Sequence, residues 1–140
     1  FTERLARAFP GIDVVGIDCV AEVLPTGSTK ARYLSGDATE IEKIPDGDIL
    51  LLKEVLPYWP DDLILSFLRR VLESGNFRYI VAAQSTRQFP HAIPLGGYRG
   101  LKFDLYPLAE IPPLKVVILS SFGSAIGIWK KDIDTIQESG

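Results

Sequence analysis

Residues 12–18 of this 140-residue chain read Ile-Asp-Val-Val-Gly-Ile-Asp and give the clearest indication of its fold class. Its apolar residues are nearly continuous from Ile12 to Ile17, a pattern typical of a strand that is covered on both faces of a sheet. The run stops at an acidic residue, Asp18, shortly after Gly16. Strands of this kind belong to parallel sheets, so the stretch predicts an α/β fold with Asp18 at the carboxyl edge of the sheet.

The rest of the chain alternates between helix and strand patterns. Helices are predicted over Thr2–Phe9 and from Asp61 to Leu72, and strands over Ala31–Leu34, Asp48–Lys53, Phe77–Ala83, Lys115–Ser121 and Ser124–Lys130. This alternation predicts a doubly wound, Rossmann-like sheet that is mostly parallel. The connection between the last two strands is too short for a crossover, so they should form an antiparallel hairpin and make the sheet mixed.

Residues 86–113 form a long Pro- and Gly-rich connection between the predicted strands. Connections of this length are uncommon in compact domains unless they are functional or disordered. Four aromatic residues within it, Phe89, Tyr98, Phe103 and Tyr106, indicate that the segment packs against the rest of the domain.

Composition limits the class of protein. Hydrophobic residues make up 46% of the chain and charged residues 24%, which predicts one globular domain over residues 1–140. The net charge of −3 gives no evidence for nucleic-acid binding. No apolar run reaches the ~20 residues of a membrane span, and no signal peptide is visible, so a cytoplasmic location is expected. With one cysteine, Cys19, and one histidine, His91, no disulfide within the chain and no metal site are predicted.

The chain contains no methionine and begins at Phe1, in what reads as the middle of a structural element. Thr2–Phe9 has helical spacing, but no capping residue precedes it beyond Thr2 itself. We therefore expect that a structural element precedes Phe1 in the molecule.

Three stretches resemble the class I S-adenosylmethionine-dependent methyltransferases. Val-Val-Gly-Ile-Asp at residues 14–18 is similar to the family's second strand with its ribose-binding acid, and Ser-Gly-Asp-Ala at residues 35–38 to the segment after its third strand. Residues 48–56 look like the fourth strand and the loop beside the methionine part of the cofactor. In addition to these three, residues 93–99, followed by 103–105, also resemble a late loop in small uncharacterised members of the family.

The resemblance covers nearly the whole chain and implies S-adenosylmethionine as cofactor and an unknown small-molecule or macromolecular methyl acceptor. The family's Gly-rich turn after its first strand is absent from the sequence. In register, that strand and turn would lie immediately before Phe1, and Thr2–Phe9 would be the rear of the first helix. The chain therefore resembles a methyltransferase domain that lacks its first strand and Gly-rich turn.

Five residues are candidates for holding the cofactor. Asp18 can accept hydrogen bonds from both vicinal ribose hydroxyls, or it can simply cap the turn after the strand. The resemblance implies that Asp37 faces the adenine amino group and that Ala38 leaves room for the ring; an ordinary Gly-Asp turn is the alternative. Cys19 can form part of an apolar surface against the adenine ring, or it can pack in the core. Lys53 would border the methionine part of the cofactor, or form a solvated pair with its neighbour.

Glu54 and Tyr58 are candidates for binding the acceptor. Glu54 leaves the sheet where open α/β folds have their ligand crevice, and it is the better candidate for a general base if the chemistry needs one. Tyr58 and Trp59 lie between two prolines and can line a substrate mouth or contact the helix that begins near Asp61. Methyl transfer from a sulfonium often needs only alignment and desolvation of the nucleophile.

Tyr98 and Arg99 follow the pair Gly96-Gly97, which allows backbone conformations that are closed to other residues. The loop can then close over the crevice, with Arg99 binding a carboxylate or phosphate through two hydrogen bonds. The alternative is a tight turn with Tyr98 in the core and Arg99 paired to Asp104.

Three classes of function remain open from the sequence. The first is a methyltransferase, and the second is a non-catalytic binding or scaffolding module that keeps the fold without the cofactor site. The third, a nicotinamide or nucleotide Rossmann protein, is disfavoured by the closing hairpin and by the lack of a Gly-x-Gly-x-x-Gly motif.

Overall fold

The computed structural model describes residues 1–19, 22, 24–25, 29–40, 44–74, 76–87, 97–120 and 123–131. It contains two compact units, Phe1–Pro45 and Asp46–Gly140, each of which we describe by itself. His91 and Gly96, which the sequence singles out, lie outside the described residues. The expectation of one domain over residues 1–140 stays a prediction.

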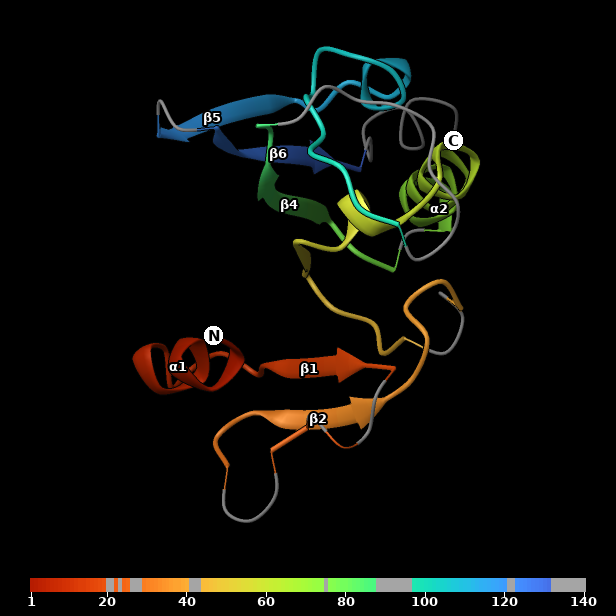
Figure 1. The fold of residues 1–140 in the computed structure, drawn as a ribbon. Coiled ribbons are helices and arrows are strands. Elements are labelled where there is room, and N and C mark those ends of the chain that lie inside the picture. The colour runs from red at the N-terminus through yellow and green to blue at the C-terminus, as the bar shows by residue number, and fades with distance from the viewer. Residues whose placement is uncertain are drawn as a thin grey trace. The chain divides into compact units, whose positions relative to one another are not determined.

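The first unit consists of helix α1 (Thr2–Ala8) and the parallel strands β1 (Val15–Asp18) and β2 (Arg32–Ser35). The two strands run side by side, and their last residues, Asp18 and Ser35, are partners in the register (Figure 1). β1 begins three residues later than predicted, because Ile12 belongs to the turn after α1, where its N–H donates to the Phe9 carbonyl at 3.0 Å. All four residues of β1 are half-buried, so the predicted full burial on both faces is not found.

Glu3 ties α1 to the segment that enters β2. Its carboxylate accepts hydrogen bonds from the Lys30 N–H at 2.6 Å, the Ala31 N–H at 3.2 Å and the Tyr33 hydroxyl at 3.0 Å. The hydrogen bond from Lys30 is the largest cause of a lowered pKa at Glu3. The pKa of Tyr33 is raised, first by desolvation and then by its hydrogen bond to Glu3. We call the three hydrogen bonds accepted by the Glu3 carboxylate the Glu3 clamp.

The first unit also has a small apolar core. Ala6, Val14 and Ala31 are buried together, with Leu5 and Tyr33 packed against them. The Tyr33 ring also covers Gly16, where an added Cβ would lie 2.9 Å from a ring carbon. Gly16 is therefore needed for close packing in the middle of β1.

The second unit is built on a four-stranded sheet with the order β3-β4-β6-β5. In chain order its elements are β3 (Ile49–Lys53), η3 (Leu56–Tyr58), α2 (Asp61–Ser74), β4 (Tyr79–Ser85), η4 (Leu108–Glu110), β5 (Lys115–Ser120) and β6 (Ser124–Lys130). β3 and β4 are parallel, whereas β4–β6 and β5–β6 are antiparallel.

The predicted hairpin is confirmed, but the predicted mostly parallel sheet is not. Two of the three pairings in the larger sheet are antiparallel, because the hairpin contributes two strands and docks through β6 on β4. The described residues contain two α-helices, α1 and α2, and the fold is α/β. A doubly wound arrangement is not established by these two units.

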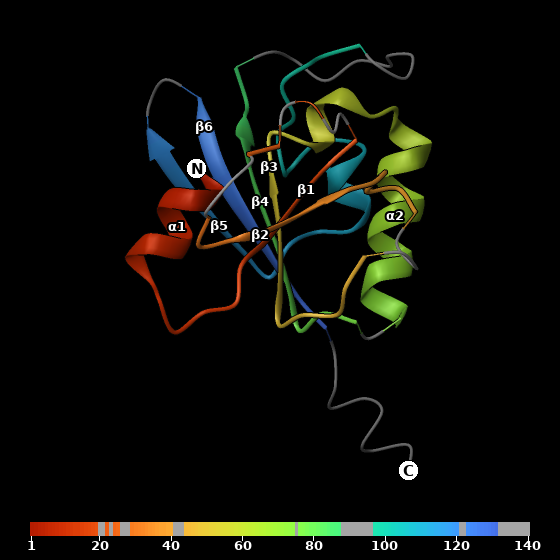
Figure 2. The ribbon, with the colours of Figure 1, turned by 90° about the horizontal axis from the view of Figure 1, so that it is seen from below.

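α2 runs along the strands of the sheet and supplies much of the core of the second unit (Figure 2). Its buried residues recur at helical spacing: Ile64, Leu65, Phe67, Leu68 and Val71. The helix begins directly after Pro60, whose carbonyl accepts the Ile64 N–H at 3.1 Å. Trp59 packs edge-on against Phe67, with ring centroids 4.9 Å apart, so this tryptophan makes the predicted helix contact.

The segment from residue 97 to residue 113 packs against the sheet through Phe103. The buried Phe103 ring lies 5.9 Å from the Trp129 ring, and the Trp129 indole N–H donates to the Ile111 carbonyl at 2.7 Å. The Phe103 ring also sits directly over Gly127, where an added Cβ would lie 2.7 Å from ring atom Cδ1. Of the four aromatic residues predicted to pack this segment, Phe103 is buried, whereas Tyr98 and Tyr106 are exposed. Phe89 lies outside the described residues.

We predict that Gly127→Ala destabilises the second unit by about 1–3 kcal/mol, because the new methyl group would overlap the Phe103 ring in a packed core. Urea unfolding followed by tryptophan fluorescence reports on this unit alone, since Trp59 and Trp129 both belong to it. Gly47→Ala is the matched control, because its Cβ would approach the Phe77 ring no closer than 3.3 Å. Equal midpoints for the two variants would contradict the packing described.

We also predict that the Glu3 clamp weakens in acid. The folded-state pKa of Glu3 is lowered, so its stabilising contribution is present above the unfolded value of 4.5 and is lost as pH falls through the folded pKa. The amide proton of Lys30 should shift in NMR spectra over that same pH range, and Glu3→Gln should abolish the shift. An unchanged titration of the Lys30 amide in the variant would show that another group causes it.

Candidate functional site

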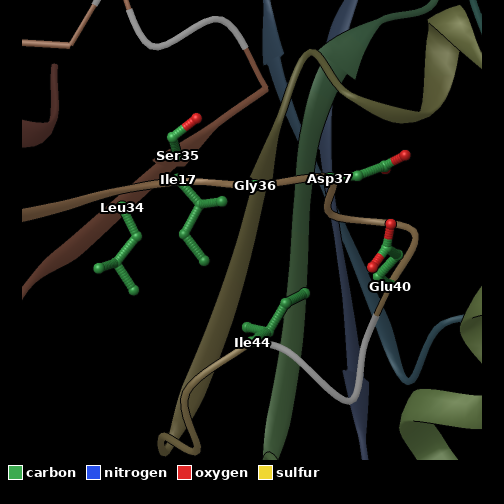
Figure 3. A pocket seen from close by; sticks show the side chains of 7 residues that line it. All are labelled: Ile17, Leu34, Ser35, Gly36, Asp37, Glu40 and Ile44. Atoms are coloured by element: carbon green, nitrogen blue, oxygen red, sulfur yellow. The ribbon is translucent and has the colours of Figure 1, made fainter.

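A hollow of about 410 Å³ lies at the carboxyl edge of the first unit's strands. It is lined by apolar and polar residues that come from β1, β2 and the segment after β2: Ile17, Leu34, Ser35, Gly36, Asp37, Glu40 and Ile44. Figure 3 shows the three apolar side chains gathered on one side and the carboxylates of Asp37 and Glu40 on the other. Its volume falls within the ~300–1,000 Å³ of small-molecule sites.

Parallel pairing places these residues together. Ile17 and Leu34 are partners in the β1–β2 register, so both strands deliver an apolar side chain at the same level. Beyond the strands, the Gly36 N–H donates to the Asp18 carbonyl at 2.9 Å, which extends the ladder by one step. Parallel strands meet at one edge with their carboxyl ends, and ligands of open α/β sheets bind at that edge.

Asp37 closes the turn that shapes the hollow. Its Oδ1 accepts hydrogen bonds from the Thr39 N–H at 2.9 Å and from the Thr39 hydroxyl at 2.6 Å. Its carbonyl accepts the Glu40 N–H at 3.0 Å. Asp37 thus forms the ordinary turn that the sequence allowed and also lines the hollow, so the two interpretations are compatible.

The other predicted cofactor residues lie around this edge or in the second unit. Asp18 is half-buried at the end of β1, next to Ile17, and is not among the residues that line the hollow. Cys19 is exposed and Ala38 is half-buried, and neither lines the hollow. Lys53 is the last residue of β3 in the second unit.

Of the seven lining residues, only Asp37 was a candidate site residue from the sequence. Four others belong to the predicted strands and the turn after them, whereas two were not singled out at all. Glu40 and Ile44 belong to the segment that follows the Asp37 turn. Glu40 comes three residues after Asp37, a spacing that a turn brings back to the same side. That signal was available in the sequence, whereas the burial of Ile44 was not.

A second group of side chains lies at the carboxyl end of the parallel pair β3–β4, within the second unit. Glu54 follows β3 directly and has a φ of 52°, a left-handed conformation that is uncommon for a residue other than glycine. Its N–H donates to the Ala83 carbonyl of β4 at 2.8 Å, which fixes this conformation at the strand end. Backbone strain of this kind is found often at functional sites.

Tyr58 and Tyr98 meet beside Glu54. Their ring centroids lie 4.9 Å apart with an interplanar angle of 55°, and the two residues remain 47% and 39% exposed. Backbone hydrogen bonds hold the Tyr98 segment in place, from the Arg99 N–H to the Pro57 carbonyl at 3.1 Å and from the Leu101 N–H to the Ser85 carbonyl at 3.0 Å. The sequence named Tyr58 and Tyr98 separately, and the structure brings them together.

Burial is the largest cause of a raised pKa at Tyr98, and the negative charge of Glu54 is the next. The Ser85 hydroxyl opposes these effects, and Tyr58 adds a smaller upward contribution. The phenol therefore stays neutral at physiological pH, beside a carboxylate, two other hydroxyl groups and the aromatic face of Tyr58.

Arg99 takes a different role from the predicted contact with substrate. Its side chain is fully buried and pairs with the Asp61 carboxylate in the first turn of α2, and it also donates to the Trp59 carbonyl at 3.3 Å. A buried guanidinium that is held by its own chain anchors the segment beneath Tyr98 and does not face solvent.

Comparison with known proteins gives a partial match. Residues of this chain are 38% identical over 73 positions to acetylserotonin O-methyltransferase 3 from Oryza sativa subsp. japonica, which covers 50% of this chain and 19% of the rice protein. The chain therefore spans about a fifth of the length of this relative. No family model matches the sequence.

Two further features limit the class of site. Among the described residues, no group of three or more His, Cys, Asp or Glu side chains is placed to hold a metal ion. In the same part of the chain, neither helix combines the length and the apolar character needed to cross a bilayer.

We predict that the phenol of Tyr98 ionises only above its ordinary pKa of 10.0, and that Glu54→Gln lowers this value, because the variant removes the negative charge beside the phenol. NMR titration of tyrosine rings labelled at Cζ measures both effects, with Tyr98→Phe to assign the signal. Glu110→Gln, an exposed acid elsewhere in the same unit, serves as the control. An equal titration of Tyr98 in the wild type and in Glu54→Gln would contradict the proximity of the two groups.

Proposed function

We propose that this protein is an S-adenosylmethionine-dependent methyltransferase and that the hollow of the first unit holds the adenosine end of the cofactor. The partial match to an O-methyltransferase supports methyl transfer in general. The more specific proposal rests on the hollow at the carboxyl edge of β1 and β2. An acidic residue stands at or just after the end of each strand, Asp18 for β1 and Asp37 for β2.

The residues around the hollow fit an adenosine group. A purine ring needs apolar contacts on its faces and an acceptor for its amino group, and ribose needs acceptors for its hydroxyls. Ile17, Leu34 and Ile44 supply the apolar surface, while Asp37 and Glu40 supply carboxylate oxygens. Gly36 leaves the rim open, because an added Cβ there would meet nothing within 4 Å.

We assign roles to the two acids at the edge on this basis. In the proposal, Asp37 accepts a hydrogen bond from the adenine amino group, and Asp18, next to Ile17 at the end of β1, accepts from the ribose hydroxyls. Cys19, Ala38 and Lys53 stay predictions as further cofactor contacts. When bound, the cofactor would supply an electrophilic methyl group on a sulfonium, and these residues would hold its adenosine end.

We predict that S-adenosylhomocysteine binds the intact protein and that Asp18→Ala and Asp37→Asn each weaken this binding by at least about tenfold, the scale for hydrogen bonds to a charged group. Isothermal titration calorimetry measures the affinity. Asp37→Asn keeps an acceptor oxygen for Thr39, so the turn is retained while the charge is lost. Asp13→Ala is the matched control, because Asp13 precedes β1 and pairs with Arg32.

Absence of heat or thermal shift at millimolar ligand would overturn the proposal. The protein would then be better described as a binding or scaffolding module with a methyltransferase-like sequence. If the wild type and all variants bind S-adenosylhomocysteine with equal affinity, the methyltransferase proposal stands, but the hollow is not its cofactor site.

A further inference from the structure

The cluster beside β3 combines three features in one exposed place. Two tyrosine rings lie 4.9 Å apart and are tilted by 55°, and each residue keeps more than a third of its surface in solvent. Glu54, which is also exposed, is close enough to act on the phenol of Tyr98 through its charge. Aromatic faces beside an exposed carboxylate are unusual for a purely packed corner, because packing buries such rings.

The cluster is held rigidly from below. Tyr58 is the last residue of η3, and the neighbouring Pro57 carbonyl accepts the Arg99 N–H at 3.1 Å, which ties the Tyr98 segment to η3. The buried pair of Arg99 and Asp61 fixes that segment to the first turn of α2. A ligand that binds here would therefore lose little free energy to ordering the site.

This combination of groups matches one class of ligand. The faces of tyrosine rings carry negative electrostatic potential and attract organic cations, above all ammonium groups. The Glu54 carboxylate near the Tyr98 phenol adds a charge-assisted contact. Anionic ligands would be repelled by Glu54, and neutral ligands would gain only the apolar contact.

We propose that Glu54, Tyr58 and Tyr98 form a recognition site for an ammonium group of the methyl acceptor, so that the acceptor belongs to the amine-bearing small molecules. The description of the ligand as an acceptor rests on the proposed methyltransferase function. The site itself rests on the geometry of the second unit and does not depend on cofactor binding.

Tetramethylammonium chloride is the probe, with tert-butanol as a neutral probe of similar shape and sodium chloride to hold the ionic strength constant. Proton–nitrogen NMR spectra of the intact protein should show saturable shifts at the amides of Glu54, Tyr58 and Tyr98 at millimolar tetramethylammonium. tert-Butanol should produce no saturable shift at these amides over the same concentrations.

Variants separate the contributions of charge and ring. Glu54→Gln and Tyr98→Leu should each weaken tetramethylammonium binding by about two- to fivefold or more, the range for an exposed cation–π contact. Tyr98→Phe keeps the aromatic face and should stay within about twofold of the wild type. Glu110→Gln and Tyr106→Leu, at other exposed positions of the same unit, should leave the affinity unchanged.

Several results would overturn the proposal: no saturable shift with tetramethylammonium, equal binding of tert-butanol, or equal affinities in Glu54→Gln and Glu110→Gln. S-adenosylhomocysteine titrated into the same protein keeps the two proposals separate. If S-adenosylhomocysteine binds and tetramethylammonium does not, the ammonium site is wrong and the methyltransferase proposal stands. If only tetramethylammonium binds, the site stands and the methyltransferase proposal fails.

Discussion

The second unit depends on a guanidinium that has been removed from water. Taking a charge out of water costs several kcal/mol unless its partners compensate, and removing one partner of a buried pair leaves that cost uncovered. Arg99 is fully buried against Asp61 and the Trp59 carbonyl. These contacts join the end of η3, the start of α2 and the segment that carries Tyr98. The positions of Tyr58 and Tyr98 beside Glu54 follow from this anchor.

The first unit depends on a different constraint, the shared edge of two short parallel strands. Their register ends with Asp18 opposite Ser35, so the chain leaves both strands at one place and turns there around Asp37. Glu3 of α1 accepts the Lys30 N–H and so holds the helix to the segment that enters β2. The Tyr33 ring packs against Gly16 of β1. A hollow lined by both strands and by the turn is the consequence.

Local patterns in the sequence predicted most elements. The apolar spacing of α2 and the short connection before β6 both act within a few residues, so they could be read correctly. Pairing direction across the larger sheet could not, because alternation of helices and strands says nothing about where a terminal hairpin docks. β1 was predicted too long because its first apolar residue, Ile12, belongs to a turn and is 57% exposed.

In the two candidate sites, too, features with a local sequence pattern were predicted and features set by long-range contacts were not. Asp18 and Asp37 were visible because each follows a strand pattern, whereas the pairing of Arg99 with Asp61 joins residues 38 positions apart and has no local signature. A single sequence also could not show that Tyr58 and Tyr98 share one corner while Trp59, next to Tyr58, faces α2. Residue type indicated the chemistry, and long-range packing decided which side chains are exposed to perform it.

We propose above that the hollow at the end of β1 and β2 holds the adenosine end of S-adenosylmethionine. Mapping the amide shifts caused by S-adenosylhomocysteine tests it most directly, because the map locates the ligand without relying on activity. If the adenosine end binds there, the largest shifts occur at Ile17, Asp18 and residues 35–40, and small ones at the far ends of both strands. Saturable shifts elsewhere in the chain with none at this edge would contradict it.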